Sequence, residues 1–367
     1  MAILGARQVG KTTLAHLTAE RRRGGTVFFD LEDPRHLAQL EEPTLTLAPL
    51  RGLVVLDEIQ NRPGLFSVLR VLADRPGTPA RFLVLGSASP DLLRQGSESL
   101  AGRIAFHDMG GFALGEVGPA NLTRLWLRGG FPRSYLGRSQ RESAEWRRDF
   151  VRTFLEHDLP RLGVAIPPVT LARFWTMLAH CHGQVWNASE FARSFGVSHT
   201  TVQKYLDLLS GLFVVRQLRP WWENVGKRAV KAARVYLRDS GLLHTLLDLD
   251  SPASLERHPR VGASWEGFIL EQVILRLRAR SEEVYFWATH AGAELDLLVT
   301  KGSTKIGFEI KRTDTPRMTR SMRSARETLR LKKLYVIHAG SASFDLESNV
   351  RAVAAADLLE EIRPLRS

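Results

Sequence analysis

The chain has 367 residues, of which 44% are hydrophobic and 25% charged, a composition typical of a globular protein with two or three domains. Basic residues outnumber acidic ones, giving a formal net charge of +12 at pH 7, and the single cysteine, Cys181, excludes an intramolecular disulfide framework. No apolar run approaches the roughly 18 residues of a membrane span, and no secretory signal pattern is found, so we expect a cytoplasmic protein without a membrane partner.

Residues 5–12 are the most informative segment, because they fit the pattern G-x-x-x-x-G-K-[ST] with Gly5, Gly10, Lys11 and Thr12 at the required positions. Glycines let backbone N–H groups surround a phosphate, and the N-terminus of the following helix adds partial positive charge. We expect Lys11 to reach the β- and γ-phosphates of ATP and the Thr12 hydroxyl to hold Mg²⁺. The residues expected to contact the nucleotide are Gly5, Ala6, Arg7, Gln8, Val9, Gly10, Lys11, Thr12 and Thr13.

Two later apolar segments supply the other expected parts of a nucleotide site. Leu53–Leu56 has the pattern of a buried strand, and it ends in Asp57 and Glu58. In a parallel sheet these carboxylates lie at the edge where ligands bind, so we expect Asp57 in the Mg²⁺ shell and Glu58 to orient or deprotonate water. Arg81–Leu85 is a further strand, and Ser87 after it either contacts the γ-phosphate or water, or simply caps a helix.

Strand and helix patterns alternate to about residue 115, which predicts an α/β domain with a parallel sheet over residues 1–118. Residues 1–120 carry 13 basic and 13 acidic side chains, residues 121–258 carry 20 and 12, and the remainder 18 and 14. The excess positive charge therefore lies outside the nucleotide-binding segment. This distribution indicates a polyanion such as DNA as partner, or else an arginine-rich composition without a ligand.

The second domain, residues 119–258, is expected to combine helices with a winged helix. Two short helices, capped by Ser189 and Ser198, precede strands at Phe213–Leu218 and Val235–Leu237. Such modules either contact DNA or only pack against neighbouring parts of the protein. The expected DNA contacts, on duplex or branched DNA, lie on the second helix and in the basic segment between the strands: His199, Thr200, Gln203, Lys204, Lys227, Arg228, Lys231 and Arg234.

The last domain, residues 259–367, is expected to be α+β and carries a second group of polar residues. The alternation in Lys305–Lys311 places a carboxylate and a lysine two residues apart on one strand face. Such side chains can bind Mg²⁺ and activate water for phosphodiester cleavage. The alternative is an ordinary amphipathic strand with a solvated face. The side chains considered for this second Mg²⁺ site are Asp296, Glu309, Lys311, Glu266 and Glu294.

In this order the motifs resemble those of bacterial and archaeal AAA+-type ATPases that pair a P-loop domain with a widespread C-terminal domain. The matching segments are Gly5–Thr13, Leu53–Gln60, Leu85–Ser89, Ser99–Arg103, Arg128–Pro132, Trp265-Glu266 and Glu309–Lys311. The resemblance implies an AAA-like core, a winged-helix middle and a restriction-endonuclease-like end of the PD-(D/E)xK type. It also implies a catalytic arginine, Arg103 or alternatively Arg94, acting in cis or across a homo-oligomer.

The sequence therefore predicts a Mg²⁺-dependent ATPase that couples ATP binding and hydrolysis to action on DNA, as a motor or remodeller. Two alternatives remain open. One is an ATP-controlled DNA-binding switch or repressor without translocation, and the other is an ATP-gated nuclease that uses Asp296, Glu309 and Lys311. Acceleration of ATP turnover by DNA is required of a motor and not of a static switch, so this measurement separates them.

Overall fold

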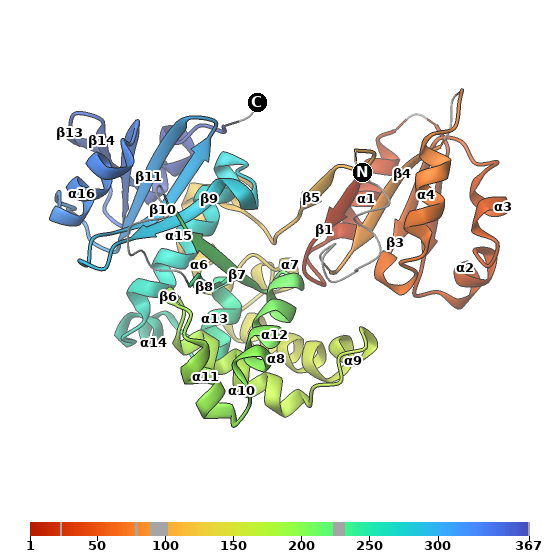
Figure 1. Ribbon diagram of the computed structural model, residues 1–367, viewed down its shortest axis with the longest axis horizontal. Coiled ribbons are helices and arrows are strands. Elements are labelled where there is room, and N and C mark those ends of the chain that lie inside the picture. The colour runs from red at the N-terminus through yellow and green to blue at the C-terminus, as the bar shows by residue number, and fades with distance from the viewer. Residues whose placement is uncertain (23, 78–79, 89–101, 223–231, 366–367) are drawn as a thin grey trace. The chain divides into compact units, whose positions relative to one another are not determined.

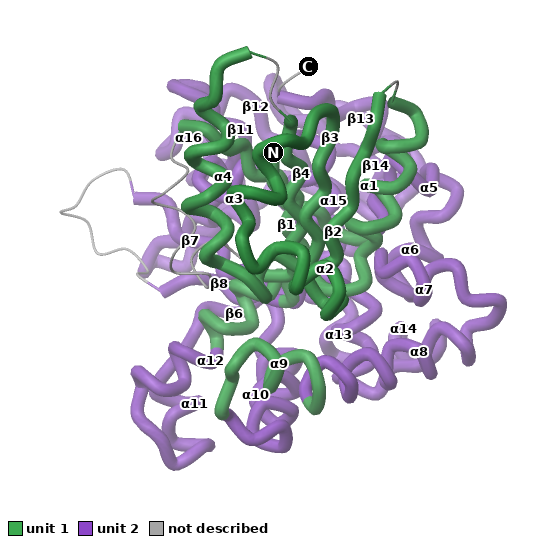
Figure 2. Tube along the Cα trace, turned by 90° about the vertical axis from the view of Figure 1, so that its right-hand side faces the viewer, with its two compact units in different colours: residues 1–111, 156–165, 206–214 green, residues 112–155, 166–205, 215–367 purple. Residues whose placement is uncertain are grey.

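The computed structural model describes residues 1–22, 24–77, 80–88, 102–222 and 232–365 (Figure 1). Two compact units can be distinguished along the chain (Figure 2). The first comprises residues 1–111, 156–165 and 206–214, and the second comprises residues 112–155, 166–205 and 215–367. The division into three domains at residues 118/119 and 258/259 stays a prediction.

The first unit is built on a five-stranded parallel sheet with the strand order β2-β3-β4-β1-β5. Its strands are β1 (Ala2–Leu4), β2 (Thr26–Asp30), β3 (Leu53–Asp57), β4 (Arg81–Gly86) and β5 (Phe106–Asp108). Its sheet is accompanied by α1 (Lys11–Glu20), α2 (Pro34–Gln39), α3 (Pro43–Leu47), η1 (Ile59–Asn61) and α4 (Leu65–Ala73). This is the α/β arrangement of a P-loop NTPase, which confirms the predicted fold class.

Strand β3 shows why this sheet forms a buried layer. All five of its residues are buried, and successive side chains point to opposite faces. Val54 and Leu56 pack with residues of α4 on one face, whereas Leu53 and Val55 pack with Ala15 of α1 on the other. A continuous apolar run is therefore required here, because helices cover both faces.

The second unit begins with helices. Its helical elements before residue 260 are α5 (Leu114–Val117), η2 (Pro119–Asn121), α6 (Leu122–Arg128), α7 (Pro132–Tyr135), α8 (Gln140–Thr153), α10 (Pro168–His180), α11 (Ala188–Phe195), α13 (Ser240–Leu246) and α14 (Pro252–Arg257). Three elements fall partly or wholly within the first unit: η3 (Phe154–Asp158), α9 (Leu159–Arg161) and α12 (His199–Gly211).

The helix caps of the expected winged helix agree with the sequence in one case only. Ser198 Oγ accepts a hydrogen bond from Thr201 N at 3.2 Å, as predicted for the second helix. The first helix begins one residue before Ser189, so Asn187 is its cap and accepts from Glu190 N at 3.3 Å. Ser189 therefore lies inside the first turn, and the prediction of its capping role was wrong.

A nine-stranded sheet runs through the second unit in the order β13-β14-β12-β11-β10-β9-β7-β8-β6. Its strands are β6 (Gln184–Val185), β7 (Val215–Pro220), β8 (Arg234–Leu237), β9 (Val284–Ala288), β10 (Glu294–Lys301), β11 (Thr304–Lys311), β12 (Lys333–His338), β13 (Phe344–Glu347) and β14 (Val350–Ala354). The accompanying helices are α15 (Val261–Leu277), η4 (Ser281–Glu283), α16 (Arg320–Leu329), η5 (Ala355–Asp357) and α17 (Leu358–Glu361).

One of the expected strands begins later than predicted. The strand expected from Phe213 begins at Val215, because Phe213 adopts a left-handed backbone with φ of 62° that a strand cannot contain. In addition, β7 pairs in parallel with β9, so strands from the expected winged-helix region and from the C-terminal region share one sheet.

Strand β11 was considered as a strand with a solvated face, and that alternative was wrong. Its central residues Gly307, Phe308, Glu309 and Ile310 are all buried. Helices α15 and α16 both pack against this strand. A carboxylate such as Glu309 must then find its partners inside the protein. Among the described residues, no helix is both long and apolar enough to cross a lipid bilayer.

Two histidines of the second unit are buried. His182 is 2% exposed, and its Nδ1 accepts a hydrogen bond from Leu237 N at 3.0 Å. His244 is fully buried, with its ring nitrogens 3.1 Å from Leu127 O and 2.7 Å from Ser264 Oγ. Burial lowers the pKa of His182 to about 3 and that of His244 to about 4.

We predict that each of these histidines destabilises the fold in acid. Below pH 6.5 the unfolded chain takes up protons that the folded chain excludes, so the free energy of unfolding decreases as the pH falls. At a pH one unit lower the loss is about 1.4 kcal/mol per histidine. Urea denaturation at pH 7.5 and 5.5 gives the change in the free energy of unfolding between the two pH values. We expect this change to be larger for the wild type than for His244→Gln by the contribution of one histidine. The exposed His199, changed to Gln, is the control and is expected to leave the pH dependence unchanged. Equal pH dependence in all three proteins would contradict the prediction.

Candidate functional site

The segment of residues 5–12 forms the loop between β1 and α1. Gly10 directly precedes α1 with φ of 100°, and a Cβ added at Gly5 would lie 2.1 Å from the Met109 carbonyl oxygen. Both positions therefore require glycine, the first for its backbone conformation and the second for a close approach of two backbones. Gly5 N donates to Gly86 O at 3.1 Å, which ties the loop to the end of β4.

Lys11 lies inside this loop. Its side chain is only 4% exposed, and its Nζ donates to the carbonyl oxygens of Gly5 and Ala6 at 3.0 Å and to Ser87 Oγ at 3.1 Å. Burial lowers the pKa of Lys11, and the nearby Glu58 and Asp57 oppose that shift. Since the present acceptors are neutral, charged phosphate oxygens would be stronger ones. The lysine fits the role expected of it.

The two residues expected to hold Mg²⁺ meet at the start of α1. Thr12 Oγ1 donates to Asp57 Oδ2 at 2.6 Å, and Asp57 is 7% exposed at the end of β3. Burial raises the pKa of Asp57, while the hydrogen bond from Thr12 lowers it. A hydroxyl and a carboxylate next to a phosphate-binding loop are the oxygen donors that Mg²⁺ prefers. These residues therefore fit ATP-bound Mg²⁺.

Glu58 and Ser87 are joined by a hydrogen bond from Ser87 Oγ to Glu58 Oε2 at 3.1 Å. Gln60, which sequence reasoning missed, contacts both: its Nε2 donates to Glu58 Oε2, and its Oε1 accepts from Ser87 N at 3.2 Å. Glu58 itself adopts a left-handed backbone conformation with φ of 55°. This conformation is energetically unfavourable for residues other than glycine, and it is often found at functional sites. The sequence feature that could have indicated this role is the position of Gln60, a polar residue two positions after Glu58.

Arg7 is the charged side chain within the loop besides Lys11. Its Nη1 donates to Asp158 Oδ1 at 2.6 Å, and its Nη2 pairs with Glu32. The sequence placed Arg7 among the residues that contact the nucleotide and gave no indication of these ion pairs. Asp158 lies 151 positions further along the chain, a distance at which no local pattern predicts a partner.

The candidate catalytic arginine lies at the surface of the first unit. Arg103 Nε is 2.8 Å from Asp74 Oδ1, and the Arg103 side chain is 42% exposed. The alternative, Arg94, falls outside the described residues. An exposed position suits a residue that acts on a neighbouring subunit, and whether Arg103 acts in cis or in trans stays a prediction.

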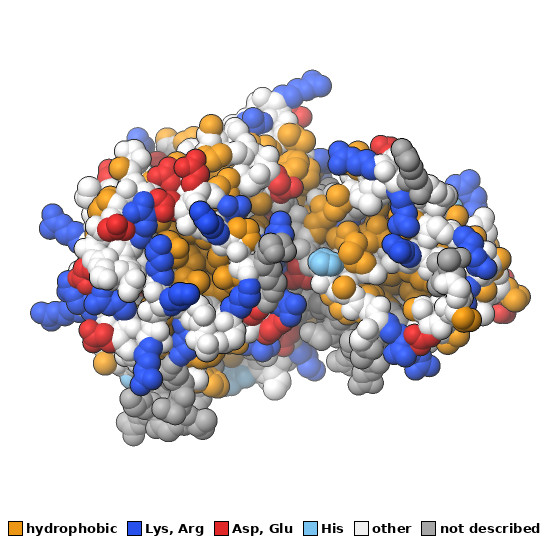
Figure 3. All heavy atoms as spheres, turned by 90° about the horizontal axis from the view of Figure 1, so that it is seen from above, with side chains coloured by type: hydrophobic (Ala, Val, Ile, Leu, Met, Phe, Trp, Pro, Cys, Tyr) orange, Lys and Arg blue, Asp and Glu red, His pale blue; other side chains and the backbone are white. Residues whose placement is uncertain are grey.

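The residues expected to contact DNA fall into three groups. His199, Thr200 and Lys204 are exposed on α12, whereas Gln203 is half-buried and accepts a hydrogen bond from Trp186 Nε1 at 2.9 Å. A second group lies outside the described residues: Lys227, Arg228 and Lys231. On the face drawn in Figure 3, Lys and Arg side chains are spread among acidic and apolar ones rather than gathered in one patch.

Arg234 forms the third group, and here the structure corrects the expectation. It is 7% exposed, and its guanidinium group faces carboxylates of the second unit. A side chain so placed cannot reach a phosphate on the surface. The reason is its position in β8, a strand inside the nine-stranded sheet, rather than in a surface loop.

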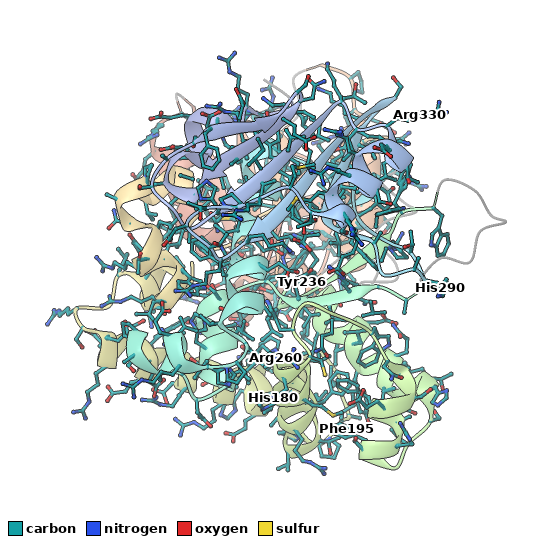
Figure 4. All side chains as sticks on the ribbon, turned by 90° about the vertical axis from the view of Figure 1, so that its left-hand side faces the viewer. His180, Phe195, Tyr236, Arg260, His290 and Arg330 are labelled. Atoms are coloured by element: carbon teal, nitrogen blue, oxygen red, sulfur yellow. The ribbon has the colours of Figure 1, made fainter. Side chains whose placement is uncertain are left out.

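The polar residues of the C-terminal segment do come together. We call Glu266, Glu294, Asp296 and Glu309 the carboxylate cluster. Arg234 pairs with Glu294 and Asp296, and Tyr236 OH, located in Figure 4, donates to Glu266 Oε1 at 2.7 Å. Lys311 Nζ lies 2.7 Å from Glu309 Oε1. Sequence reasoning missed Tyr236, whose spacing of two from Arg234 on a strand was the available signal.

A second Mg²⁺ site does not follow from this convergence. Among the described residues, no group of three or more His, Cys, Asp or Glu side chains is arranged to hold a metal ion. Burial, together with the charge of Asp296, raises the pKa of both Glu266 and Glu309 to about 8. A metal ion would also have to displace the arginine and lysine side chains that already pair with carboxylates of the cluster. The cluster as it stands does not fit the ion.

Similar proteins give independent information on this chain. Residues 1–118 match a family model described as an AAA domain, and residues 119–253 and 261–358 match two domains of unknown function, DUF8612 and DUF4143. The uncharacterized proteins Mb2031c of Mycobacterium bovis and Rv2008c of Mycobacterium tuberculosis are each 50% identical over 357 residues, which are 97% of this chain and 80% of each relative.

Among solved structures, the RuvB Holliday junction branch migration motor of Thermotoga maritima is similar with a TM-score of 0.29 and 16% identity, over 59% of this chain and 81% of that one. A mutant of the same protein gives a TM-score of 0.30 at the same identity, over 59% of this chain and 82% of that one. At these scores the similarity says nothing about activity.

Proposed function

Since the chain belongs to the same family as the two mycobacterial proteins and its first 118 residues are an AAA domain, we propose that it is a Mg²⁺-dependent ATPase that couples ATP binding and hydrolysis to action on DNA. The ATPase proposal rests on two groups of hydrogen-bonded side chains. Ser87 is hydrogen-bonded to both Lys11 and Glu58, and Thr12 is hydrogen-bonded to Asp57. All five side chains lie where β1, β3 and β4 end, at one edge of the parallel sheet.

Each of these residues has a distinct task in hydrolysis. Lys11 and the loop N–H groups bind the phosphates, while Thr12 and Asp57 hold the ion. Bound Mg²⁺ neutralises charge on the phosphate oxygens. The Glu58 carboxylate orients the attacking water or accepts its proton, which requires that the carboxylate itself be fixed.

Gln60 and Ser87 do this fixing, because both donate hydrogen bonds to Glu58 Oε2. Ser87 also accepts a hydrogen bond from Lys11, so the phosphate-binding lysine and the water-orienting glutamate are joined through one hydroxyl. Binding of the γ-phosphate to Lys11 would weaken that link and leave Ser87 free to contact the phosphate. This link supports the proposal that Lys11 and Glu58 act in the same reaction.

The DNA part of the proposal rests on charge and exposure. Residues 121–258 carry 20 basic against 12 acidic side chains, whereas residues 1–120 are balanced. Within the charged region, His199, Thr200 and Lys204 are exposed at the N-terminal half of α12, where phosphate or base contacts would form. We further propose a homo-oligomer, which the exposed Arg103 requires if it acts on a neighbouring subunit.

The test of this function is ATP turnover with and without duplex or branched DNA. A motor or remodeller is expected to hydrolyse ATP several-fold faster when DNA is present. A plot of the logarithm of the DNA-binding constant against the logarithm of the salt concentration has a negative slope. In Lys204→Ala this slope should be smaller in magnitude by about 0.9, the contribution of one phosphate contact. The matched control is Lys332→Ala, which removes an exposed lysine elsewhere and should leave the slope unchanged.

Two outcomes would redirect the proposal. Tight DNA binding without any change in turnover would favour the alternative, an ATP-controlled switch or repressor that does not translocate. Absence of DNA binding at low salt would contradict a DNA partner altogether, while leaving the ATPase assignment intact.

A further inference from the structure

Strand β8 directs two polar side chains at the carboxylate cluster. Arg234 and Tyr236 are two residues apart, so they lie on the same face of the strand. The Arg234 Nη2 atom donates to Glu294, and its Nη1 atom lies 3.5 Å from Asp296 Oδ1 and 4.0 Å from Glu266 Oε1. One guanidinium group therefore faces three carboxylates that come from two separate elements, α15 and β10.

The guanidinium group is enclosed as well as paired. Arg234 is 7% exposed and Asp296 is 2% exposed, so their charges are screened little by water. The Phe286 ring lies over the guanidinium carbon, 5.0 Å from ring centroid to Cζ. Such a contact favours a cation at this position. Arginine keeps its charge when buried, so the positive charge here is permanent.

Several oxygen atoms of the carboxylate cluster already accept hydrogen bonds from the protein. Asp296 Oδ2 accepts from Ile310 N at 2.9 Å, and Glu266 Oε1 accepts from Tyr236 OH. Lys311 pairs with Glu309 Oε1. Glu309 Oε2, which is buried, accepts no hydrogen bond from the described residues. An ion bound there would lie beside the Lys311 ammonium group, which pairs with the other oxygen of the same carboxylate.

From this geometry we infer that Arg234 takes the place of a metal ion in the carboxylate cluster. The cluster is then a salt-bridged link between β8 and β10, two strands separated by β7 and β9 in the sheet. A divalent cation would have to enter beside two fixed positive charges, Arg234 and Lys311, and compete with them for the same oxygens. The cluster binds such an ion only when the guanidinium group is removed.

This inference does not depend on the ATPase assignment, and it bears on the nuclease alternative. A metal ion that assisted phosphodiester hydrolysis at Asp296 and Glu309 would have to bind next to Asp296, whose Oδ1 now faces Arg234. As long as Arg234 keeps its place, the C-terminal region is expected to contribute a structural link and no cleavage of DNA.

Mn²⁺ titration of the full chain, without nucleotide, tests the inference. All proteins carry Asp57→Asn, so that the loop site does not contribute to the signal. Free Mn²⁺ is followed by electron paramagnetic resonance up to about 1 mM, which is above the dissociation constants of all but the weakest protein sites for divalent ions. With Arg234 present we expect no stoichiometric binding. Arg234→Met, which keeps the unbranched stem but removes the charge, is expected to bind about one Mn²⁺ per chain.

Matched variants separate charge from packing. Arg234→Lys retains a positive charge and is expected to bind no Mn²⁺, whereas Asp296→Asn added to Arg234→Met should abolish the binding gained. The melting temperature of Arg234→Met should also rise on addition of Mn²⁺, and that of the parent should not. Stoichiometric Mn²⁺ binding by the parent that Asp296→Asn removes would overturn the inference, whether or not Arg234→Met folds. A folded Arg234→Met without Mn²⁺ binding would overturn it as well.

Discussion

Replacing Lys11 with alanine is expected to reduce ATP hydrolysis by about two to three orders of magnitude, the range found when one preorganised donor to a developing charge is removed. Lys11 Nζ is held by Gly5, Ala6 and Ser87 inside the loop where we expect the phosphates to bind. Release of inorganic phosphate measures the loss. Because Lys11 is 4% exposed, Lys11→Met serves as the control that keeps the packing. Both variants should lose activity and retain the thermal stability of a folded protein.

The companion variant Glu58→Gln is expected to bind ATP normally while hydrolysing it about a hundredfold more slowly or worse. The amide has the shape of the carboxylate, so the contacts with Gln60 and Ser87 can be kept in part, but it cannot accept a proton from water. Binding of a fluorescent ATP analogue and phosphate release measure the two effects separately. Unchanged turnover in both Lys11→Ala and Glu58→Gln would remove the ATPase assignment.

The second large effect concerns Arg103. If this residue completes the γ-phosphate site of a neighbouring subunit, Arg103→Ala should bind ATP and hydrolyse it about a thousandfold more slowly. Activity per subunit of the wild type should then rise with protein concentration. The ion pair with Asp74 does not prevent this role, since exposed ion pairs are weak in water.

Mixing variants tests whether Arg103 acts between subunits. Arg103→Ala retains the phosphate-binding loop, and Lys11→Met retains Arg103. At an interface between the two variants, one subunit supplies the loop and the other the arginine, so part of the activity should be recovered. Asp74→Asn is the matched control, because it removes the partner of Arg103 and leaves the arginine itself. A rate that is independent of concentration, with no recovery on mixing, would indicate an arginine acting in cis.

The parts of the nucleotide site that the sequence predicted depend on local patterns. The loop of residues 5–12 needs glycine where the backbone turns and where it approaches Met109, and both requirements are met within a few residues of chain. The apolar run Leu53–Leu56 marks a strand that helices cover on both faces. Because parallel strands end at the same edge, the sequence also indicated that Asp57 and Ser87 would lie near the loop.

The side-chain partners around that loop were decided by the tertiary structure alone. Gln60 bridges Glu58 and Ser87 because η1 turns back toward the end of β4, and nothing in the four letters D-E-I-Q specifies that turn. Arg7 pairs with Asp158 across 151 residues of chain. Such contacts form only when separate elements have packed, so a pattern within a window of the sequence cannot contain them.

The carboxylate cluster shows the same division within a single strand. Alternation in Lys305–Lys311 correctly put Glu309 and Lys311 on one face, since the two-residue period is a local property of extended backbone. Whether that face meets water, a metal ion or another side chain depends on what packs against it. Here α15 packs against β11, and β8 supplies Arg234 to the carboxylates of the neighbouring strand β10 from about 60 residues away, so a residue expected on the surface became the counterion of carboxylates within the protein. The sequence by itself determined which side chains share a face of the strand, because alternation is local. Only the packing of the sheet determined which charged side chain pairs with the carboxylates.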